Sequence, residues 1–468
     1  MNQVWKHVAC PGCGCVCDDI TLSFKGETLE TFSPACKTGE AWFRNRHETS
    51  AVASIEGRDS TVDQALDHAA DLLTRADYPL VYGLSRSATP GQRAAVSLAD
   101  RLGGAVDTTA SLCHGPSIMA IQEVGEVTCT LGEVRNRADL VIFWGCNPAD
   151  SHPRHADRYS VNASGVHVPK GRDDRFVVMV GEAGQIEQWK IDEAGTEPDL
   201  RIEIEPGRDF EVLSLLRRML SEQVGETPST AARPPAENVS VATTEKLRHL
   251  TSKIQTSRYG VVFFGLGLAG ESPWAGKQIP QVGHVNVAAL LQWVAELNQI
   301  TRFNARRMRL QGDVSGADNV LCWQTGYPFA VDFSRGYPRY NPGEYSANEL
   351  LERGDVDLAL LVGAETIPYF SDRARQHLDR IPVIILDYPG ASSSLQAQVR
   401  FTTAVYGLHA EGTAYRMDNV PVPLRALMPT RLPTDEFVLE SLQQRYEERC
   451  PSADKAATEL MLNDRLLG

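Results

Sequence analysis

Apolar runs that end in glycine recur along this chain and alternate with segments of helical spacing. After the capping pair Ser60-Thr61, apolar residues at helical intervals predict a helix over 62–73, and the run Pro79-Leu-Val-Tyr-Gly83 predicts a buried strand. These runs lack the strict two-residue alternation of a half-exposed strand, so they suit parallel strands covered by helices on both faces. The sequence therefore predicts an α/β fold with doubly wound parallel sheets.

Other segments continue the same alternation. Pro90-Gly91 opens a predicted helix that stops at Gly103-Gly104. Further strands are predicted at 138–144, 176–180, 200–204, 259–265 and 356–362, and further helices over 247–255, 285–297 and 435–449.

The second half of the chain echoes the first. Asp139-Leu-Val-Ile-Phe-Trp-Gly145 is similar to Asp357-Leu-Ala-Leu-Leu-Val-Gly363, and residues 225–244, rich in Pro, Ser and Thr, are typical of a linker. We therefore expect an N-terminal segment over 1–58, two related α/β domains over 59–224 and 245–405, and a C-terminal segment over 406–468. If the domains face each other, their strand-end glycine loops share one cleft of the kind that binds phosphate-bearing ligands.

Length and charge narrow the class of protein. A chain of 468 residues exceeds one hydrophobic core, and a formal net charge of -14 with scattered Lys and Arg argues against nucleic acid or an anionic membrane as partner. The sequence has no apolar segment of signal-peptide length at its start and no stretch long enough to cross a bilayer. We expect a cytoplasmic protein, in which the ten cysteines favour metal ligation over disulfides.

Four cysteines near the start form a ligand pattern. Cys10, Cys13, Cys17 and Cys36 are spaced so that three thiolates and a fourth after a loop can wrap a tetrahedral metal or an iron–sulfur cube. Spacing alone leaves zinc and an iron–sulfur cluster as open alternatives. Cys15 is one thiol too many for four ligands and is predicted to point away.

A second cysteine motif, Cys113-His114-Gly-Pro116, is predicted to lie on a sharp turn outside a helix. A lone cysteine is most often a buried core thiol, but an exposed thiolate beside a histidine can act as a nucleophile or a soft metal ligand, and His114 can move a proton. Arg309 can pair with a small carboxylate, although the arginines crowded near it make a solvated side chain the default.

Two further segments are candidates for ligand contact. Gly145-Cys-Asn147 follows a predicted strand, so its backbone amides and the Asn147 side chain can face an anion. Glu411-Gly-Thr-Ala-Tyr-Arg-Met417 is predicted to be a glycine turn. Cys129 and Cys146 have no partner at ligand spacing and are predicted to be core residues.

Long motifs give the chain a family resemblance. They are CPGCGCVCDDI at 10–20, CHGP at 113–116, WGCNPADSHPRHADRYS at 144–160, WQTGYPFAVDFSRGYPRYNPGEYSANELL at 323–351 and AEGTAYRMDNVPVPLR at 410–425. Together they resemble the molybdopterin oxidoreductase family, and within it the B subunits of formylmethanofuran dehydrogenases.

The resemblance implies cofactors and roles. Cys10, Cys13, Cys17 and Cys36 would ligate a [4Fe-4S] cluster, and the Cys113 thiolate would bind molybdenum or tungsten held by two pyranopterin guanine dinucleotides. His114 and Arg309 match the substrate-side histidine and arginine of formate dehydrogenases, which take a hydride from formate or return one to carbon dioxide. The implied cofactor-binding residues are Gly145, Asn147, His152, Gly363, Glu411, Gly412, Thr413 and Arg416.

This chain departs from the family pattern in two places. The family usually has a lysine two residues after the fourth cluster cysteine, whereas here Lys37 follows Cys36 directly and Thr38 takes the expected position. Single-chain relatives also end in a β-barrel that closes over the pterins, whereas this chain has only a short segment after Arg425. The resemblance therefore implies partner subunits: one with the capping β-barrel and one of amidohydrolase type that joins formate to a furan-type carrier.

Two rival functions remain open at this stage. The chain could be a cofactor-free structural subunit of a bacterial formyltransferase/hydrolase complex, or a zinc-stabilised α/β binding protein. The retained cysteines argue against the scaffold, which has no chemical use for them.

Overall fold

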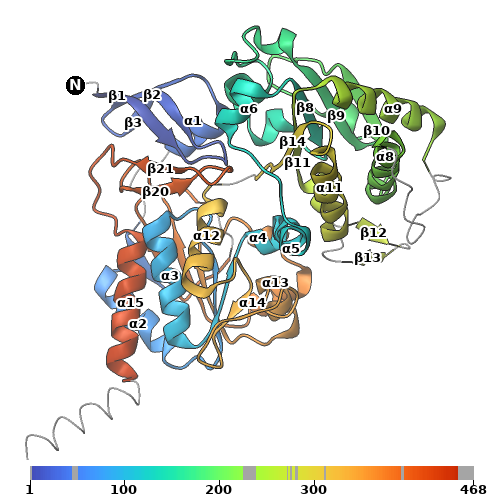
Figure 1. The fold of residues 1–468 in the computed structure, drawn as a ribbon. Helices are drawn as coiled ribbons and strands as arrows, with labels where there is room; N and C mark the ends of the chain where they lie inside the picture. The colour runs from blue at the N-terminus through green and yellow to red at the C-terminus, as the bar shows by residue number, and fades with distance from the viewer. Residues whose placement is uncertain are drawn as a thin grey trace, which may run out of the picture.

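The computed structural model describes residues 3–44, 51–224, 239–270, 283–309, 312–391 and 395–451, with the backbone of 272–274 and 277–279. Two sheets form its two lobes (Figure 1). The smaller sheet is entirely parallel. Its strands, in sheet order, are β10 (Leu200–Ile204), β9 (Phe176–Glu182), β8 (Leu140–Trp144), β11 (Tyr259–Phe264) and β14 (Arg302–Arg307).

The larger sheet has a parallel centre and antiparallel edges. Its nine strands, in sheet order, are β16 (Arg339–Tyr340), β15 (Val331–Asp332), β7 (Ala105–Thr108), β6 (Pro79–Gly83), β17 (Leu358–Val362), β18 (Val383–Asp387), β19 (Val399–Thr402), β4 (Ala53–Ile55) and β5 (Arg58–Ser60). The five strands from β7 to β19 are parallel, and a hairpin pairs antiparallel at each edge. The predicted α/β class is confirmed.

Helices cover both faces of the nine-stranded sheet. Successive residues of β6 point to opposite faces, with Val81 in one apolar core and Tyr82 in the other. On the Val81 side lie α2 (Val62–Leu73), α3 (Thr89–Leu102), α12 (Val314–Thr325) and α15 (Asp435–Arg449), and on the other side lie α13 (Ala347–Arg353) and α14 (Asp372–Leu378). As predicted, Thr61 caps α2 in a capping box, and Gly103, with φ of 64°, ends α3.

The five-stranded sheet is covered in the same way. One face packs against α5 (Gly115–Val124), α8 (Asp209–Val224), α9 (Val241–Thr256) and α11 (Gly283–Leu297). The other face packs against α6 (Leu131–Arg137), a π-helical turn (Ala156–Ser160) and the N-terminal segment. That segment is an antiparallel sheet of β1 (Gln3–Cys10), β2 (Cys17–Lys25) and β3 (Thr28–Ser33), followed by α1 (Lys37–Phe43).

Short elements complete the fold. They are α4 (Ala110–Cys113), α7 (Pro148–Ser151), α10 (Leu266–Ala269), the hairpins β12 (Ser272–Trp274) with β13 (Lys277–Ile279) and β20 (Gly412–Tyr415) with β21 (Pro421–Leu424), and 3-10 turns at Gly171–Asp174, Ile186–Gln188 and Ile367–Tyr369. The predicted glycine turn after Glu411 is therefore wrong, because Gly412 begins a strand. Among the described residues, no helix has the length and apolar character needed to cross a membrane.

The predicted domain boundaries at 59–224 and 245–405 are wrong. Strands of both ranges meet in each sheet: β8 pairs with β11, and β6 pairs with β17. The unit with the five-stranded sheet is thus an insertion, which the chain enters after β7 and leaves after β14. Parallel neighbours are joined by long crossovers and need not be consecutive, so apolar runs alone do not assign a strand to a sheet.

The outer boundaries shift as well. The predicted linker 225–244 lies inside the inserted unit: α9 begins at Val241, and residues 225–238 lie outside the described residues. In the predicted 1–58 segment, β4 already belongs to the nine-stranded sheet. In the predicted 406–468 segment, α15 packs on α2 and α3, where Arg445 pairs with Asp67, and residues 452–468 lie outside the described part.

The internal echo has a structural meaning. The strand before Gly145 pairs with the strand before Gly265, and the strand before Gly363 pairs with the strand that ends at Gly83. Each sheet therefore holds one strand of the echoed pair, β8 or β17, beside a strand followed by a Gly-Leu step, Gly265-Leu266 or Gly83-Leu84, and these glycines lie at the carboxyl edge, where parallel sheets bind ligands.

Substitution of Gly145 can test whether the loop that follows β8 is closely packed. The φ of Gly145 is 61°, and a Cβ there would lie 2.5 Å from the Leu268 nitrogen, whereas Gly184, with φ of 84°, has open space around it. Gly184→Ala should cost only the backbone strain, roughly 1–2 kcal/mol. Gly145→Ala should lower the free energy of unfolding clearly more in denaturant titrations. Equal losses would mean that the Gly145 loop is not closely packed.

Candidate functional site

Two chain crossings between the lobes carry the principal candidate residues. The first leaves β7 and runs through α4, Cys113 and His114 into α5, which packs on the five-stranded sheet; Figure 1 shows α4 and α5 between the lobes. The second returns after β14: the Met308 amide donates to the Phe264 carbonyl (2.8 Å), and the Asp313 amide donates to the Ser85 carbonyl (2.8 Å). The crossings therefore join the carboxyl edges of the two sheets.

Cys113 is the last residue of α4 and is not on a free turn, so that prediction is wrong. Its side chain is partly exposed, and its thiol donates to the Thr109 carbonyl at 3.2 Å. Loss of hydration raises the pKa of Cys113 to about 12, although Arg309 pulls it down. The side chain is thus a neutral thiol at pH 7 unless a cation binds it, which favours a metal ligand over a free nucleophile.

His114 separates α4 from α5 and is 1% exposed. Burial, together with the charges of Arg309 and Arg307, holds its pKa well below the usual range, so the imidazole is neutral. Neither ring nitrogen is hydrogen-bonded within the described residues. A buried imidazole with two unsatisfied nitrogens indicates a ligand-facing side chain.

Arg309 is buried, whereas the sequence analysis took a solvent-exposed side chain as the more common case. Its Nη1 donates to Asp318 Oδ2 at 2.6 Å, and the other Asp318 oxygen accepts from Thr108 Oγ1 at 3.1 Å. The Arg309 backbone oxygen lies 2.6 Å from Nε2 of His152. Thr108 and Arg309 belong to different crossings, so Asp318 ties the two crossings together. Nε of Arg309 has no partner in the described part of the chain.

His152, implied by the resemblance to bind the cofactor, contacts the arginine crossing from within the protein. It is fully buried, with Nδ1 2.9 Å from Ser151 Oγ and Nε2 on the Arg309 carbonyl, and burial lowers its pKa to about 4. It therefore supports Arg309, with both ring nitrogens used inside the protein.

The four N-terminal cysteines are buried together. Cys10 ends β1 and pairs in register with Cys17 of β2, Cys13 lies in the turn between them, and Cys36 caps α1. The pKa of Cys10 is raised by burial and then by the neighbouring thiols of Cys13 and Cys17, and the pKa of Cys36 is raised for the same reasons. Folding thus gathers the thiols that the sequence singles out.

Cys15 does not point away, so that prediction is wrong. It is 1% exposed, and its S–H lies within hydrogen-bonding reach of the sulfurs of Cys13 and Cys17, which raises the pKa of Cys15. The hydrogen bond to Cys17 is the main cause of the lowered pKa of Cys17, with further contributions from the cations Arg154 and Arg158.

The cysteine group can be compared with the two kinds of metal site. Among the described residues, no three Cys, His, Asp or Glu side chains are arranged so that they could hold a metal ion. A [4Fe-4S] cube does not require the four sulfurs to converge on one metal ion, because each thiolate binds a different iron. Four buried thiols, whose neighbouring charges help to raise the pKa of Cys10 and Cys36, match the donor set of such a cube, since a positively charged centre relieves this repulsion.

The Gly145 loop is closed on itself. Asn147 Nδ2 donates to Asp150 Oδ2 at 2.7 Å, and Asn147 Oδ1 accepts from the Lys190 amide at 3.0 Å. The Asn147 side chain is therefore already hydrogen-bonded within the protein, and its contact with an anion stays a prediction. Gly363 lies at the end of β17, with φ of 82°, and a Cβ there would lie 2.8 Å from Glu365 Oε2.

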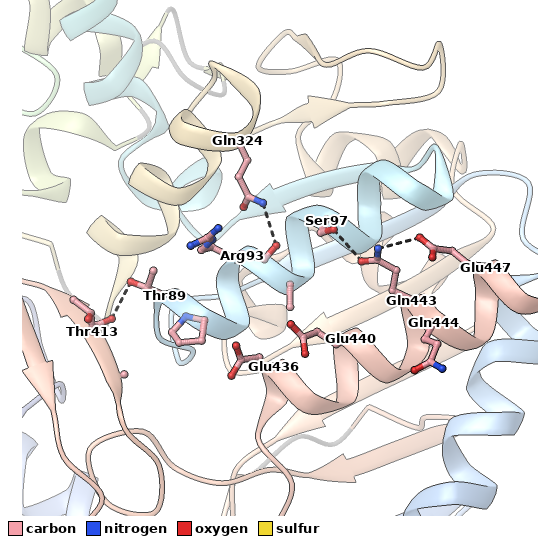
Figure 2. A pocket seen from close by; sticks show the side chains of 13 residues that line it. Thr89, Arg93, Ser97, Gln324, Thr413, Glu436, Glu440, Gln443, Gln444 and Glu447 are labelled. Carbon is pink, nitrogen blue, oxygen red and sulfur yellow. Dashed lines mark hydrogen bonds between the residues drawn. The ribbon is translucent and has the colours of Figure 1, made fainter. Parts of the chain in front are cut away.

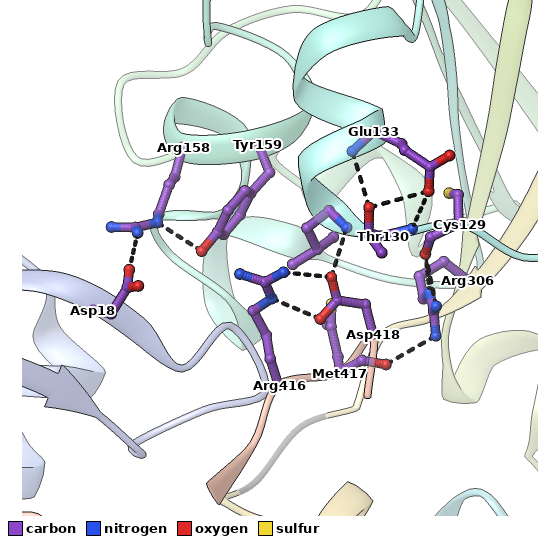
Figure 3. A network of polar contacts seen from close by, with 11 residues as sticks. Asp18, Cys129, Thr130, Glu133, Arg158, Tyr159, Arg306, Arg416, Met417 and Asp418 are labelled. Atoms are coloured by element: carbon purple, nitrogen blue, oxygen red, sulfur yellow. Dashed lines mark hydrogen bonds and ion pairs between the residues drawn. The ribbon is translucent and has the colours of Figure 1, made fainter. Parts of the chain in front are cut away.

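The predicted residues of segment 411–417 separate into two places. Gly412 and Thr413 line a pocket of about 660 Å³ between β20, α3 and α15, where Thr89 donates to the Thr413 carbonyl (Figure 2). Glu411 is exposed. Arg416 forms a two-pronged ion pair with Asp418 at 2.6 and 2.7 Å (Figure 3).

Several buried groups near Cys113 were missed from the sequence. Arg306 and Arg307, which the sequence analysis did not propose as site residues, are 3% and 7% exposed, while Arg302 is exposed. Ser117, one turn after His114, is fully buried, and its Oγ has no partner in the described residues. The sequence offered one usable signal, the cluster of Arg302, Arg306, Arg307 and Arg309 within eight residues. Cys129 and Cys146 are core residues, as predicted.

Comparison with known proteins fits this arrangement. No family model matches the sequence. The B subunit of the tungsten-containing formylmethanofuran dehydrogenase 2 of Methanocaldococcus jannaschii is 36% identical over 460 residues, which cover 96% of this chain and 100% of that protein. The protein of the same name from Methanococcus maripaludis is 36% identical over 456 residues, which cover 95% of this chain and 99% of that protein.

This chain belongs to the family of formylmethanofuran dehydrogenase B subunits. The family resemblance predicted from the motifs is confirmed. A chain in the solved formyltransferase/hydrolase complex FhcABCD from Methylorubrum extorquens, in complex with methylofuran, has the same fold, with a TM-score of 0.66 at 21% identity, covering 86% of this chain and 100% of that chain. The relatives of this chain are thus parts of multisubunit complexes.

The buried histidines behind Arg309 predict a pH effect on stability. Burial lowers the pKa of His155 to about 3 from 6.5, so the unfolded chain takes up the proton first as the pH falls below 6.5. Between pH 6 and 4 the wild type should lose about 1.4 kcal/mol per pH unit more than His155→Phe, whose ring keeps the packing against Phe263. Urea titrations at several pH values test this, and parallel pH curves for the two proteins would refute a buried neutral His155.

Proposed function

We propose that this chain is the redox subunit of a formylmethanofuran dehydrogenase-like complex. It interconverts carbon dioxide and formate at a molybdenum or tungsten bis(pyranopterin guanine dinucleotide), for one-carbon transfer to or from a methanofuran-type carrier. The observation that carries the proposal is the set of unsatisfied buried groups, His114, Ser117 and Arg309, gathered at Cys113 where the two sheets meet.

Each of these groups has a place in the proposed reaction. When bound, the cofactor accepts the two electrons that formate loses as it becomes carbon dioxide and a proton, or returns them. Cys113 supplies the soft sulfur ligand to the metal. Arg309, whose free Nε–H is buried, donates to the formate carboxylate, and Asp318 and His152 hold the arginine in position. Neutral His114 has a ring nitrogen available to hydrogen-bond and orient the substrate.

We assign Cys10, Cys13, Cys17 and Cys36 to a [4Fe-4S] cluster that conducts the electrons. The turn that carries Cys13 packs directly on the arginine crossing: the Met417 amide donates to the Gly14 carbonyl at 2.7 Å, and a Cβ on Gly14 would lie 2.8 Å from the Arg309 carbonyl. That contact supports a short path between the two centres. Lys37 lies outside this path, because it is half exposed and its Nζ is 3.2 Å from Asp150.

The proposed partners are the other subunits of such a complex. One carries the β-barrel that closes over the pterins, and one of amidohydrolase type joins formate to the carrier. The Gly145 and Gly363 loops and the Gly412–Thr413 strand would contact the cofactor through their backbones, since Asn147 and Arg416 are already paired within the protein.

A cofactor-free structural subunit is the second candidate, because the chain shares its fold with the FhcABCD complex. Metal analysis of the anaerobically purified native complex separates the alternatives. Iron together with molybdenum or tungsten supports the redox subunit, zinc alone supports a zinc-stabilised binding protein, and no metal supports the scaffold. The last two results would overturn the proposal.

Variants then test the individual residues. Cys113→Ala should abolish formate oxidation and leave the iron content intact, whereas Cys322→Ala, which changes an exposed thiol, should leave both unchanged. Cys36→Ser should lower the iron content, whereas Cys15→Ser should retain it, because Cys15 is the thiol that the cluster does not need. Unchanged turnover in Cys113→Ala would remove Cys113 from the mechanism.

A further inference from the structure

Arg307 is a buried cation without a hydrogen bond. It ends β14 with its side chain 9% exposed, and within the described residues none of its N–H groups has a hydrogen-bond partner. Its nearest carboxylate, Glu126, is 4.0 Å from Nη2, and one Glu126 oxygen is also buried without a partner. Leaving a guanidinium N–H unpaired in the interior is costly, and the buried Nε of Arg307 is such a donor, so this arrangement indicates a missing acceptor.

The neighbouring arginines are used differently. Arg306 donates to the Cys129 carbonyl through Nε (3.0 Å) and Nη2 (2.6 Å) and to the Met417 carbonyl through Nη1 (3.1 Å), as Figure 3 shows. Arg309 is paired with Asp318. Successive residues of a strand point to opposite faces, so Arg306 faces the side of α6, whereas Arg307 faces the side of α5, which follows Cys113-His114.

The charges around this point do not balance. Three guanidiniums, on Arg306, Arg307 and Arg309, have two carboxylates, Asp318 and Glu126, in ion-pair contact within the described part of the chain. The charge of Arg307 also reaches the reacting groups, because it lowers the pKa of both Cys113 and His114. The excess positive charge thus faces the Cys113 end of α5 and favours a small anion there.

We propose that Arg307 is a second carboxylate-binding residue of the formate site, donating two parallel hydrogen bonds to formate beside His114 and Ser117. This assignment rests on the proposed function and extends it. One N–H group of Arg309 already donates to Asp318. The Arg307 guanidinium makes no intramolecular hydrogen bond, so it can bind a carboxylate through two parallel N–H donors more readily than Arg309 can. Glu126, at 4.0 Å, is close enough to orient Arg307 without occupying its donors.

The test compares Arg307→Met with Arg306→Met in the purified complex, with the exposed Arg335→Met as control. Formate binding is measured at equilibrium by titration of ¹³C-formate followed by NMR, beside melting temperature, metal and pterin content and the KM for formate. Arg307→Met should weaken formate binding about 10- to 100-fold, the loss of a charge-assisted hydrogen-bonded pair. Its melting temperature should fall less than that of Arg306→Met, because Arg307 has no hydrogen bond to lose and only one distant ion-pair partner, Glu126 at 4.0 Å.

Arg306→Met should show the reverse pattern. It leaves the carbonyls of Cys129 and Met417 without donors, so the melting temperature should fall while formate binding is unchanged. Loss of metal or pterin in Arg307→Met would overturn the proposal in favour of a cofactor ligand, and a lower melting temperature with unchanged formate binding would overturn it in favour of a structural role.

The outcomes separate this proposal from the redox function. If the wild-type complex binds formate but holds neither molybdenum nor tungsten, the redox function fails, and weaker binding by Arg307→Met still supports the assignment. If the wild-type complex is loaded and oxidises formate while Arg307→Met binds formate equally well, the assignment alone fails.

Discussion

The buried pair between Arg309 and Asp318 is the contact on which the candidate site depends. Asp318 accepts from Arg309 of one crossing and from Thr108, which precedes Cys113 on the other, so one carboxylate fixes the two crossings relative to each other. Breaking a buried pair by removing one partner typically costs about 3–5 kcal/mol, because the remaining charge is uncompensated. His152 adds a second support from behind through the Arg309 carbonyl.

The interleaved topology explains why residues so far apart in sequence meet. Because one α/β unit is inserted into the other, the chain must cross between the two carboxyl edges twice. One crossing carries the thiol and the imidazole, the other carries the guanidinium, and the N-terminal cysteine turn packs against the second. In the proposed function, fold and chemistry share one cause, since the crossings that join the sheets also bring together the residues assigned to formate, the metal and the electron path.

Much of the fold could be predicted from the sequence. Strands such as 79–83 and 140–144 are buried on both faces, and they therefore appear in the sequence as continuous apolar runs. The pairing of strands could not be predicted, since a parallel neighbour is chosen by long-range packing that leaves no local pattern. The same limit applies to the site. The four cysteines and Cys113 stand out by spacing, whereas the burial of Arg307, the turn inward of Cys15 and the internal pairing of Asn147 depend on three-dimensional neighbours.

The central claim is that the sulfur of Cys113 binds a heavy metal at the meeting point of the two sheets. X-ray absorption at the molybdenum or tungsten edge measures this directly in the native complex and in the Cys113→Ser variant. The account predicts that the variant loses one sulfur neighbour of the metal and gains a lighter one. Identical spectra from the two proteins, or no edge signal in the wild type, would contradict it.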